Sequence, residues 1–397
     1  MLQPAYVTKS MQAGLMVGLF LLYAFGAPVH AVELRGHSIP VTKVLKTPLF
    51  VAQLSLTESG STEAPAVFEA RGIYLSGHVA GDDDRFYELV KLVETTELNA
   101  MVIDVKDATG KTTYISQVPA VREYGAYSDK IEDLPGRVEE LLRRGIYPIA
   151  RLVVFKDPVL ARARPDLAVQ RPDGTVWVDY NGLAWTNPYA KEVWEYNLAI
   201  AREVAAMGFK EIQFDYVRFP SDGPLALAVY PGRTELTRAM TIASFLAEAR
   251  RQLAAEGVVL SADIFGLVVS AADDLGIGQY YEAIQGSVDV VCPMVYPSHY
   301  GPYSFGIADP DSSPYEIVFR AMQDAVRRRK PGSAAIRPWL QDFSLRHTYG
   351  PAEVRRQIEA AKEAGVNQWL LWNPASQYTT AALREVLVDW ERAPLLR

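Results

Sequence analysis

The sequence predicts a parallel (β/α)8 barrel, and three observations lead to that fold class. Eight short runs rich in β-branched and aromatic residues recur between residues 72 and 373, and a helical pattern follows each of them. Glycine closes several helical patterns and a strand follows at once, as at Gly145, Gly208, Gly257 and Gly365. Alternating units of this kind form a parallel sheet covered by helices, and eight strands are the number that closes such a sheet into a barrel.

The expected elements follow from these patterns in chain order. Asn187-Pro188 starts the third helix as its cap and first turn. We interpret the acidic run 82–84 as the first turn of the first helix, where it matches the helix dipole, rather than as a metal cluster. The expected strands are 72–76, 100–105, 146–154, 211–216, 258–265, 288–296, 335–343 and 367–373. The expected helices are 83–97, 133–144, 188–207, 234–255, 279–285, 314–329, 351–364 and 378–391.

An open doubly wound sheet is the alternative architecture. Such sheets normally stop at five to seven strands and often carry a glycine-rich first turn. The turn after the first expected strand reads SGHVAGDDD (76–84) and lacks that fingerprint. The barrel is therefore the favoured fold, and we expect it over residues 70–397.

The composition agrees with a large folded unit and excludes several classes of protein. The chain has 397 residues, of which 49% are hydrophobic and 22% charged, which excludes disordered and collagen-like chains. A net charge of −7 argues against a nucleic-acid partner. The single cysteine, Cys292, allows no internal disulfide. Motifs for zinc, for a phosphate loop or for an esterase nucleophile are absent from the sequence, so we expect no metal and no other cofactor.

The first 31 residues have the features of a secretory signal. Lys9 precedes the apolar run AGLMVGLFLLYAFGA (13–27), and Ala31 ends a small-residue cleavage site. The run is shorter than the ~20 residues that span a membrane, which favours a cleaved signal. The alternative is an uncleaved membrane anchor through 13–27. Either interpretation predicts a secreted, periplasmic or envelope-associated protein. Residues 32–69, with the small polar stretch SLTESGSTEAPA (55–66), then form a linker or arm.

Side-chain alternation predicts which residues face the barrel interior. In the fourth strand Ile212 and Phe214 form the apolar set that packs on helices, which leaves Asp215 inward. Burying a carboxylate costs several kcal/mol unless it is paired, so aspartates at several strand ends indicate a functional crater. The other residues expected inward are Asp104, Lys106, Arg151, Asp263, Tyr296, Trp339, Gln341 and Trp372.

Carboxylates that face each other across a pocket suit glycoside hydrolysis. Separations of ~5 Å and ~6.5–9.5 Å distinguish retaining from inverting enzymes. A neighbouring cation would keep one carboxylate ionised, while an apolar niche would raise the pKa of the other. Aromatic rings near the strand ends could stack on the apolar faces of sugar rings, although core packing explains about half of them equally well.

Six sequence runs resemble a bacterial family of glycoside hydrolase-like barrels of largely unknown function. They are NAMVIDVKDATGK (99–111), WTNPYAKEVWEYN (185–197), GFKEIQFDYVRFPSDG (208–223), SADIFG (261–266), PMVYPSHY (293–300) and RPWLQDF (337–343). The resemblance spans residues 70–395 and implies a barrel fold. By analogy it also implies a polysaccharide or oligosaccharide substrate.

A more distant resemblance implies individual roles. FDYVRFP is similar to the fourth-strand motif of α-amylase-type barrels, which implies that Asp215 is the nucleophile. Those enzymes place a glutamate acid on the fifth strand, where this chain has Asp263. Their third carboxylate would fall on Asp342, but the alternation places Gln341 inward instead.

We therefore expect Asp215 as nucleophile or base, Asp263 as general acid and Asp104 as third carboxylate. The expected substrate-binding residues are Arg151, Arg218, Lys106, Gln341, Tyr296, Trp339 and Trp372. One alternative is a non-catalytic carbohydrate-binding or envelope protein on the same barrel, since fold does not guarantee activity. Another is a metal-dependent lyase or hydrolase that holds Mg²⁺ or Ca²⁺ on Asp104, Asp107 and Asp263.

Overall fold

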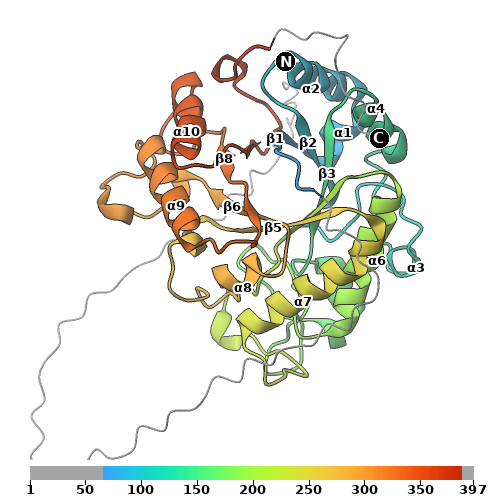
Figure 1. Cartoon of the computed structure of the whole chain (residues 1–397). Coiled ribbons are helices and arrows are strands. Elements are labelled where there is room, and N and C mark those ends of the chain that lie inside the picture. Colours follow the sequence, from blue (N-terminus) through green and yellow to red (C-terminus); the bar gives the residue numbers. More distant parts are fainter. Residues whose placement is uncertain (1–65, 387–397) are drawn as a thin grey trace, which may run out of the picture. The chain divides into compact units, whose positions relative to one another are not determined.

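The described part of the chain forms a closed parallel barrel. The computed structural model describes residues 66–386, so the predicted signal segment and most of the predicted arm lie outside it. Every strand pair is parallel, and the pairings β1–β9 and β5–β6 close the sheet into a ring (Figure 1). The strands are β1 (Arg71–Leu75), β2 (Ala100–Lys106), β3 (Tyr147–Val153), β4 (Glu211–Asp215), β5 (Val259–Phe265), β6 (Val290–Val295), β7 (Ala335–Ile336), β8 (Trp339–Gln341) and β9 (Trp369–Trp372).

The nine strands occupy eight positions in the barrel, because β7 and β8 are two halves of the seventh strand. Both halves pair with β6, and only β8 pairs with β9. Pro338 lies between the halves and has no N–H to donate to a ladder, so the strand is interrupted there. The predicted (β/α)8 barrel is confirmed, with the run 335–343 forming a broken rather than a continuous strand.

Helices surround the ring of strands (Figure 1). Asp82 caps α2 by accepting a hydrogen bond from the Arg85 N–H at 2.9 Å, which confirms the acidic run as a helix start. The short helices α1, α3 and α5 carry too few residues for a periodic signal and were not predicted. The helices are α1 (Gly77–Gly81), α2 (Asp83–Thr95), α3 (Pro119–Glu123), α4 (Leu134–Arg143), α5 (Pro158–Ala163), α6 (Lys191–Ala206), α7 (Arg238–Leu253), α8 (Tyr281–Gln285), α9 (Pro314–Arg328) and α10 (Pro351–Glu363).

Two helix predictions were wrong in part. Asn187 accepts a hydrogen bond from the Tyr189 N–H at 3.0 Å and closes a turn, so α6 begins only at Lys191. The last predicted helix, 378–391, is a 3₁₀ turn at Thr380–Ala382 followed by extended chain as far as the structure describes it. The Glu97 N–H donates to the Arg384 carbonyl at 2.8 Å, and the Arg384 N–H donates to the Glu97 carboxylate at 3.0 Å, which holds that extended segment beside the end of α2.

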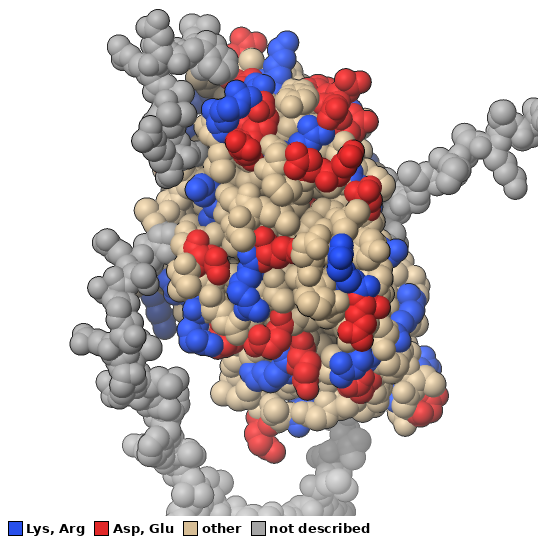
Figure 2. All heavy atoms as spheres, turned by 90° about the vertical axis from the view of Figure 1, so that its right-hand side faces the viewer, with Lys and Arg blue, Asp and Glu red and all other residues tan. Residues whose placement is uncertain are grey.

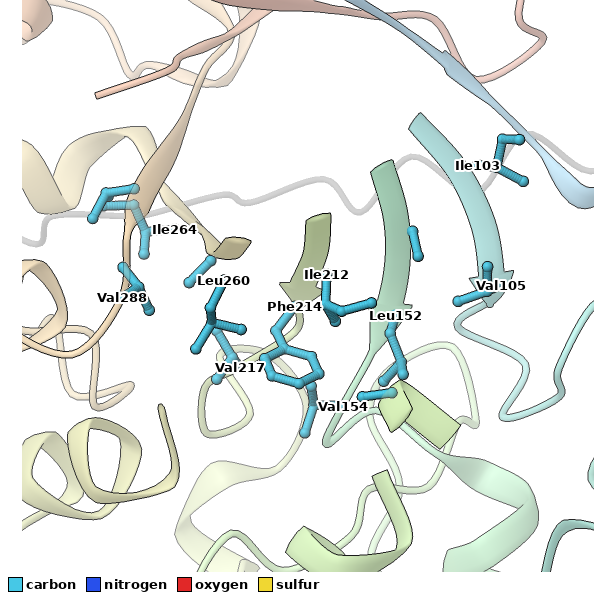
Figure 3. Close-up of a cluster of buried hydrophobic side chains, with 14 of the residues drawn as sticks. Ile103, Val105, Leu152, Val154, Ile212, Phe214, Val217, Leu260, Ile264 and Val288 are labelled. Carbon is cyan, nitrogen blue, oxygen red and sulfur yellow. The ribbon is translucent and has the colours of Figure 1, made fainter. Parts of the chain in front are cut away.

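The alternation of side chains divides the core into two layers. Outward-facing residues of neighbouring strands, such as Ile103, Ile212, Phe214 and Leu260, pack in the large apolar cluster under the helices (Figure 3). A smaller cluster fills the barrel interior and includes Ile149, Val290 and Leu370 among its buried members. This division confirms the predicted inward and outward sets of β4 and β5, and those of β2 as far as Val105.

The amino ends of the strands are closed by an ion pair and an aromatic stack. Arg337 donates to Glu211 at 2.7 Å, and both side chains are fully buried. Arg337 also donates to the carbonyl of Phe68 at 3.0 Å, and the Phe68 ring stacks on Tyr147 with centroids 4.5 Å apart. The amino end is thus filled by side chains, whereas the inward aspartates lie toward the opposite, carboxyl end of the barrel.

The surface carries both signs of charge. Lysine and arginine side chains are interspersed with aspartate and glutamate on the face seen in Figure 2. Among residues 66–386, no helix has the length and apolar character needed to cross a membrane.

Candidate active site

Three aspartates from three strands converge on one arginine at the carboxyl end of the barrel. Arg151 on β3 donates to Asp104 Oδ1 on β2 at 2.5 Å, and to Asp215 Oδ2 on β4 at 2.5 Å and 3.0 Å. Asp263 Oδ2 on β5 lies 3.9 Å from Nε of Arg151. The expected convergence of Asp104, Asp215, Asp263 and Arg151 is therefore present, and these four residues are 1–6% exposed.

The distance between Asp215 and Asp263 is bounded by their shared neighbour. Nε of Arg151 lies 3.0 Å from Asp215 Oδ2 and 3.9 Å from Asp263 Oδ2. The two carboxylate oxygens are therefore separated by at most the sum of these distances, roughly 7 Å. That limit covers the separation of retaining glycosidases and only the lowest part of the inverting range.

The environments of the carboxylates differ. Burial and the adjacent Asp215 raise the pKa of Asp263 well above its usual value, against the opposing effect of Arg151. Burial also raises the pKa of Asp104, although Arg151 and Tyr74 both favour its charged form. Asp215 accepts two hydrogen bonds from Arg151 and one from the Tyr216 N–H. The site thus places a carboxyl group whose pKa is raised beside a second one that is held by hydrogen-bond donors.

Trp339 holds Asp263 through a hydrogen bond from the barrel interior. Its indole N–H donates to Asp263 Oδ1 at 2.8 Å, and the residue is 1% exposed. The expectation that Trp339 offers an open ring face to a sugar is wrong, because the ring is buried in the barrel interior. The carboxyl oxygen of Asp263 that remains free of this donor is Oδ2, on the side of Asp215.

Trp372 and Tyr74 line the other side of the crater. Their rings stack with centroids 4.1 Å apart, and the guanidinium of Arg151 lies 5.2 Å from the Trp372 ring. The Tyr74 hydroxyl donates to Asp104 Oδ2 at 2.6 Å. Tyr74 faces inward, as the alternation along β1 predicts, although it was not among the expected substrate-binding residues. Trp372 is half-buried, so part of its ring is accessible.

Tyr296 and Gln341 lie on the β6 and β8 side. Tyr296 is buried, and burial together with Asp263 and Asp215 raises the pKa of its phenol. Gln341 accepts a hydrogen bond from the Ser298 N–H at 3.1 Å and donates to the Phe343 carbonyl at 2.9 Å. Gln341 therefore ties the β6 loop to the end of β8, and its amide is occupied by the protein itself.

Lys106 was predicted in the crater, and the structure places it elsewhere. The β2–β3 register shifts between Asp104 and Lys106, so the alternation fails at that point. The Lys106 ammonium pairs with Asp157 at 2.8 Å and donates to Asn197 on α6 at 3.2 Å. Lys106 thus holds α6 against the barrel wall.

Two other acidic residues considered from the sequence serve local structure. Asp107 pairs with Lys130 at 2.7 Å and accepts from Thr109. Asp342 accepts from the Thr379 N–H at 2.9 Å and from its hydroxyl at 2.6 Å. Within residues 66–386 no cluster of three histidine, cysteine, aspartate or glutamate side chains is arranged to hold a metal ion.

Arg218 lies just beyond β4, over the ring of Phe265 at 4.6 Å and beside Trp185 at 4.9 Å. It donates to the Phe219 carbonyl and to Ser221, and no ion pair with Asp215 is present. The expected role of orienting a carboxylate is therefore not supported by a contact. A neighbouring cation, Lys156, was not predicted; it pairs with Asp179 at 2.9 Å, and nothing in the local sequence pattern links the two.

An inward set of carboxylates at the carboxyl end of a closed (β/α)8 barrel is the arrangement of a glycoside hydrolase-type domain. The chain belongs to the family described as "Putative glycosyl hydrolase domain", whose sequence model matches residues 72–378. No curated protein matches the chain.

Solved structures agree on the fold. The glycoside hydrolase domain of PgaB (BpsB) from Bordetella bronchiseptica aligns at 14% identity with a TM-score of 0.57, over 77% of this chain and 94% of that chain. The α-galactosidase TtGalA from Thermus thermophilus aligns at 16% identity with a TM-score of 0.51, over 80% and 64%. A hypothetical protein from Ruminiclostridium thermocellum is 40% identical over 52% of this chain and 98% of that chain, with a TM-score of 0.44.

Proposed function

We propose that the protein hydrolyses a glycosidic bond in a polysaccharide outside the cytoplasm, with Asp215 as nucleophile and Asp263 as general acid. The observation that carries the proposal is the approach of these two side chains, from adjacent strands, to the same atom of Arg151. Family membership supports the reaction class, because the matched family is one of glycosyl hydrolase domains.

The chemistry follows from the two environments. In the first step Asp215 attacks the anomeric carbon while the proton of Asp263 passes to the leaving oxygen. Asp263 then accepts a proton from the water that releases the sugar from Asp215, which restores both groups. The ~7 Å upper limit favours this retaining course over inversion, in which a water must fit between the carboxyl groups.

The remaining site residues position these two groups or the sugar. Arg151 holds Asp104 and Asp215 in place and neutralises part of their charge. Asp104 is hydrogen-bonded to both Arg151 and Tyr74. It would tune the pKa of the catalytic carboxyl groups through Arg151, or accept a hydrogen bond from a sugar hydroxyl. Trp372 is the aromatic ring best placed to stack on a sugar, with Tyr296 across the crater.

A non-catalytic carbohydrate-binding barrel is the second candidate. One observation favours it: the crater residues are almost fully buried, and the Arg151 guanidinium occupies the space between Asp104 and Asp215. The metal-dependent alternative finds no support, since Asp107 is engaged by Lys130.

Export of the protein is part of the proposal and rests on the sequence of residues 1–31, which lie outside the described part of the chain. Cleavage after Ala31 would release the barrel, whereas retention of residues 13–27 would leave it attached to the membrane.

A panel of cell-wall and storage glycans incubated with the wild-type protein and with D215N tests the proposal. We expect reducing ends to accumulate with the wild-type protein only, and NMR of the first product to show retained anomeric configuration. Binding of a glycan without release of reducing ends by the wild-type protein would establish the second candidate instead.

A further inference from the structure

Arg218 is a buried cation that forms no ion pair with an acidic side chain among residues 66–386. It is 5% exposed, and its guanidinium is surrounded by the rings of Trp185, Tyr216 and Phe265 at 4.6–5.0 Å. One nitrogen, Nη1, donates both of its hydrogen bonds, to the Phe219 carbonyl at 3.1 Å and to Ser221 Oγ at 3.0 Å. Among the described residues no carboxylate oxygen lies within 4.0 Å of this guanidinium.

A buried, uncompensated charge is costly, so it needs a functional or structural reason. The carboxyl groups that act electrostatically on Arg218 are those of Asp215, Asp222 and Asp179, and none of them forms an ion pair with its guanidinium. Asp215 is paired with Arg151, and Asp179 is paired with Lys156. Burial, and then Asp179, raise the pKa of Asp222, which disfavours its charged form.

The position of Arg218 is next to the proposed reaction centre. Its neighbour Tyr216 directly follows Asp215, and Phe265 lies two residues beyond Asp263 on β5. Since residues i and i+2 of a strand share a face, the Phe265 ring lies on the crater side, one layer above Asp263. The Arg218 guanidinium, 4.6 Å from that ring, therefore lies beyond the carboxyl ends of β4 and β5, the two strands that carry Asp215 and Asp263.

The loop that carries Arg218 is held in a fixed shape. Tyr216 has φ of 49°, a left-handed conformation that costs energy for a residue with a side chain. The Phe219 N–H donates to the Ile277 carbonyl at 2.8 Å. Gly223 packs so closely on Trp177 that a Cβ there would lie 2.7 Å from Cζ2. A strained backbone held by its surroundings is typical of a preorganised site.

We propose that Arg218 binds the carboxylate of an acidic sugar unit, so that the glycan substrate contains a uronic acid next to the bond that is cleaved. The inference rests on the proposed function and names its substrate class. The planar guanidinium matches a carboxylate with two parallel hydrogen bonds, and a carboxylate would neutralise the charge that the protein leaves uncompensated. Sulfate and phosphate esters offer the same oxyanion chemistry, and the experiment distinguishes them.

Binding is measured by calorimetry on D215N protein, which removes turnover. The probes are glucuronate and galacturonate, the corresponding neutral sugars, and glucose 6-sulfate and 6-phosphate. We expect the uronates to bind at least about tenfold more tightly than the neutral sugars and more tightly than the sulfate and phosphate esters. R218M should abolish the preference while R218K retains part of it. A preference for the sulfate or phosphate ester would overturn the uronate assignment, and equal binding of acidic and neutral sugars would overturn the site.

Arg238 provides the matched control. Its guanidinium also lies over two aromatic rings, Phe219 at 5.2 Å and Tyr230 at 5.5 Å, but it is held by the Gly276 carbonyl away from the crater. R238M should keep the preference for uronates. A preference that disappears equally in R238M and R218M would show a general effect of charge and refute the site. The glycan panel reads hydrolysis separately, so a protein that binds uronates through Arg218 but cleaves nothing would refute only the proposed function.

Discussion

The indole N–H of Trp339 donates a hydrogen bond of 2.8 Å to Oδ1 of Asp263. The donor occupies Oδ1, so a proton on this carboxyl group resides on Oδ2, the oxygen on the side of Arg151 and Asp215. If Asp263 is the general acid, as proposed, this hydrogen bond would direct its proton toward the side on which Asp215 lies. It also stabilises the charged form of Asp263, which limits how far burial raises the pKa.

W339F should shift the alkaline limb of the pH–rate profile to higher pH. A general acid works while it is protonated, so activity falls as the pH rises through its pKa. Loss of the indole donor destabilises the carboxylate and raises the pKa of Asp263 further. The profile of kcat/KM on the substrate found in the glycan panel measures the shift. W372F, which replaces an indole that makes no hydrogen bond to Asp263, should leave the limb in place, and an unmoved limb in W339F would contradict the assignment of the acid.

D215N should lower kcat by at least about a hundredfold, because the amide cannot act as nucleophile or base. The fold should persist, since the amide oxygen can still accept from Arg151. Reducing-end release and thermal unfolding measure the two effects. D342N is the control: Asp342 holds Thr379 rather than the crater, so its loss should lower stability and spare kcat. Comparable losses of kcat in the two variants would argue that D215N acts through the fold.

R151Q should destabilise the barrel by about 3–5 kcal/mol, the range seen when a buried charge loses its partner. Removal of the guanidinium leaves Asp104, Asp215 and Asp263 facing one another without a cation. Adding D104N should recover part of the loss. Urea unfolding at neutral pH measures both effects. R327Q breaks a largely exposed pair with Asp324 and should change the midpoint little, so an equally small change in R151Q would contradict the ion cluster.

D263N should increase stability relative to the wild type as the pH rises from about 4. The pKa of Asp263 in the folded state is raised above its unfolded value. Its contribution to stability is thus complete below the unfolded pKa and is lost as the pH rises through the folded pKa. An asparagine has no such loss. Urea unfolding from pH 4 to pH 8 gives the difference, and a constant offset across that range would show that Asp263 does not titrate as proposed.

K106M should destabilise the protein by about 3–5 kcal/mol without changing KM, because Asp157 would remain buried without its cation. The same unfolding experiment and steady-state kinetics on a glycan substrate separate the two quantities. A large rise in KM at unchanged stability would show instead that Lys106 takes part in substrate binding.

The barrel and its three central aspartates followed from the period-two pattern of the strands. Asp104, Asp215 and Asp263 were predicted inward because their neighbours Ile103, Phe214 and Ile264 had to pack against helices. The same rule failed at Lys106, where the regular pairing of β2 with β3 is interrupted. A bulge between Asp104 and Lys106 depends on pairing with β3, which a single strand's pattern does not encode.

Contacts between residues far apart in the chain could not be predicted from the sequence pattern either. Trp339 was predicted at the crater as a sugar platform, but its bond to Asp263 joins residues 76 positions apart. The loop past β4 holds Arg218 among aromatic rings from three separate segments, and only the closed fold brings them together. The extended segment after Ala382 depends on Glu97, far upstream in the chain, and no local pattern there could reveal it.

Phe68 stacks on Tyr147 at the amino ends of the strands, where Arg337 also binds its carbonyl. The polypeptide therefore joins the barrel at the end opposite the crater. A tether attached at Phe68 itself would leave the protein from the end of the barrel opposite Asp215. Large polymers could then be tested against a tethered protein without the support standing between them and Asp215.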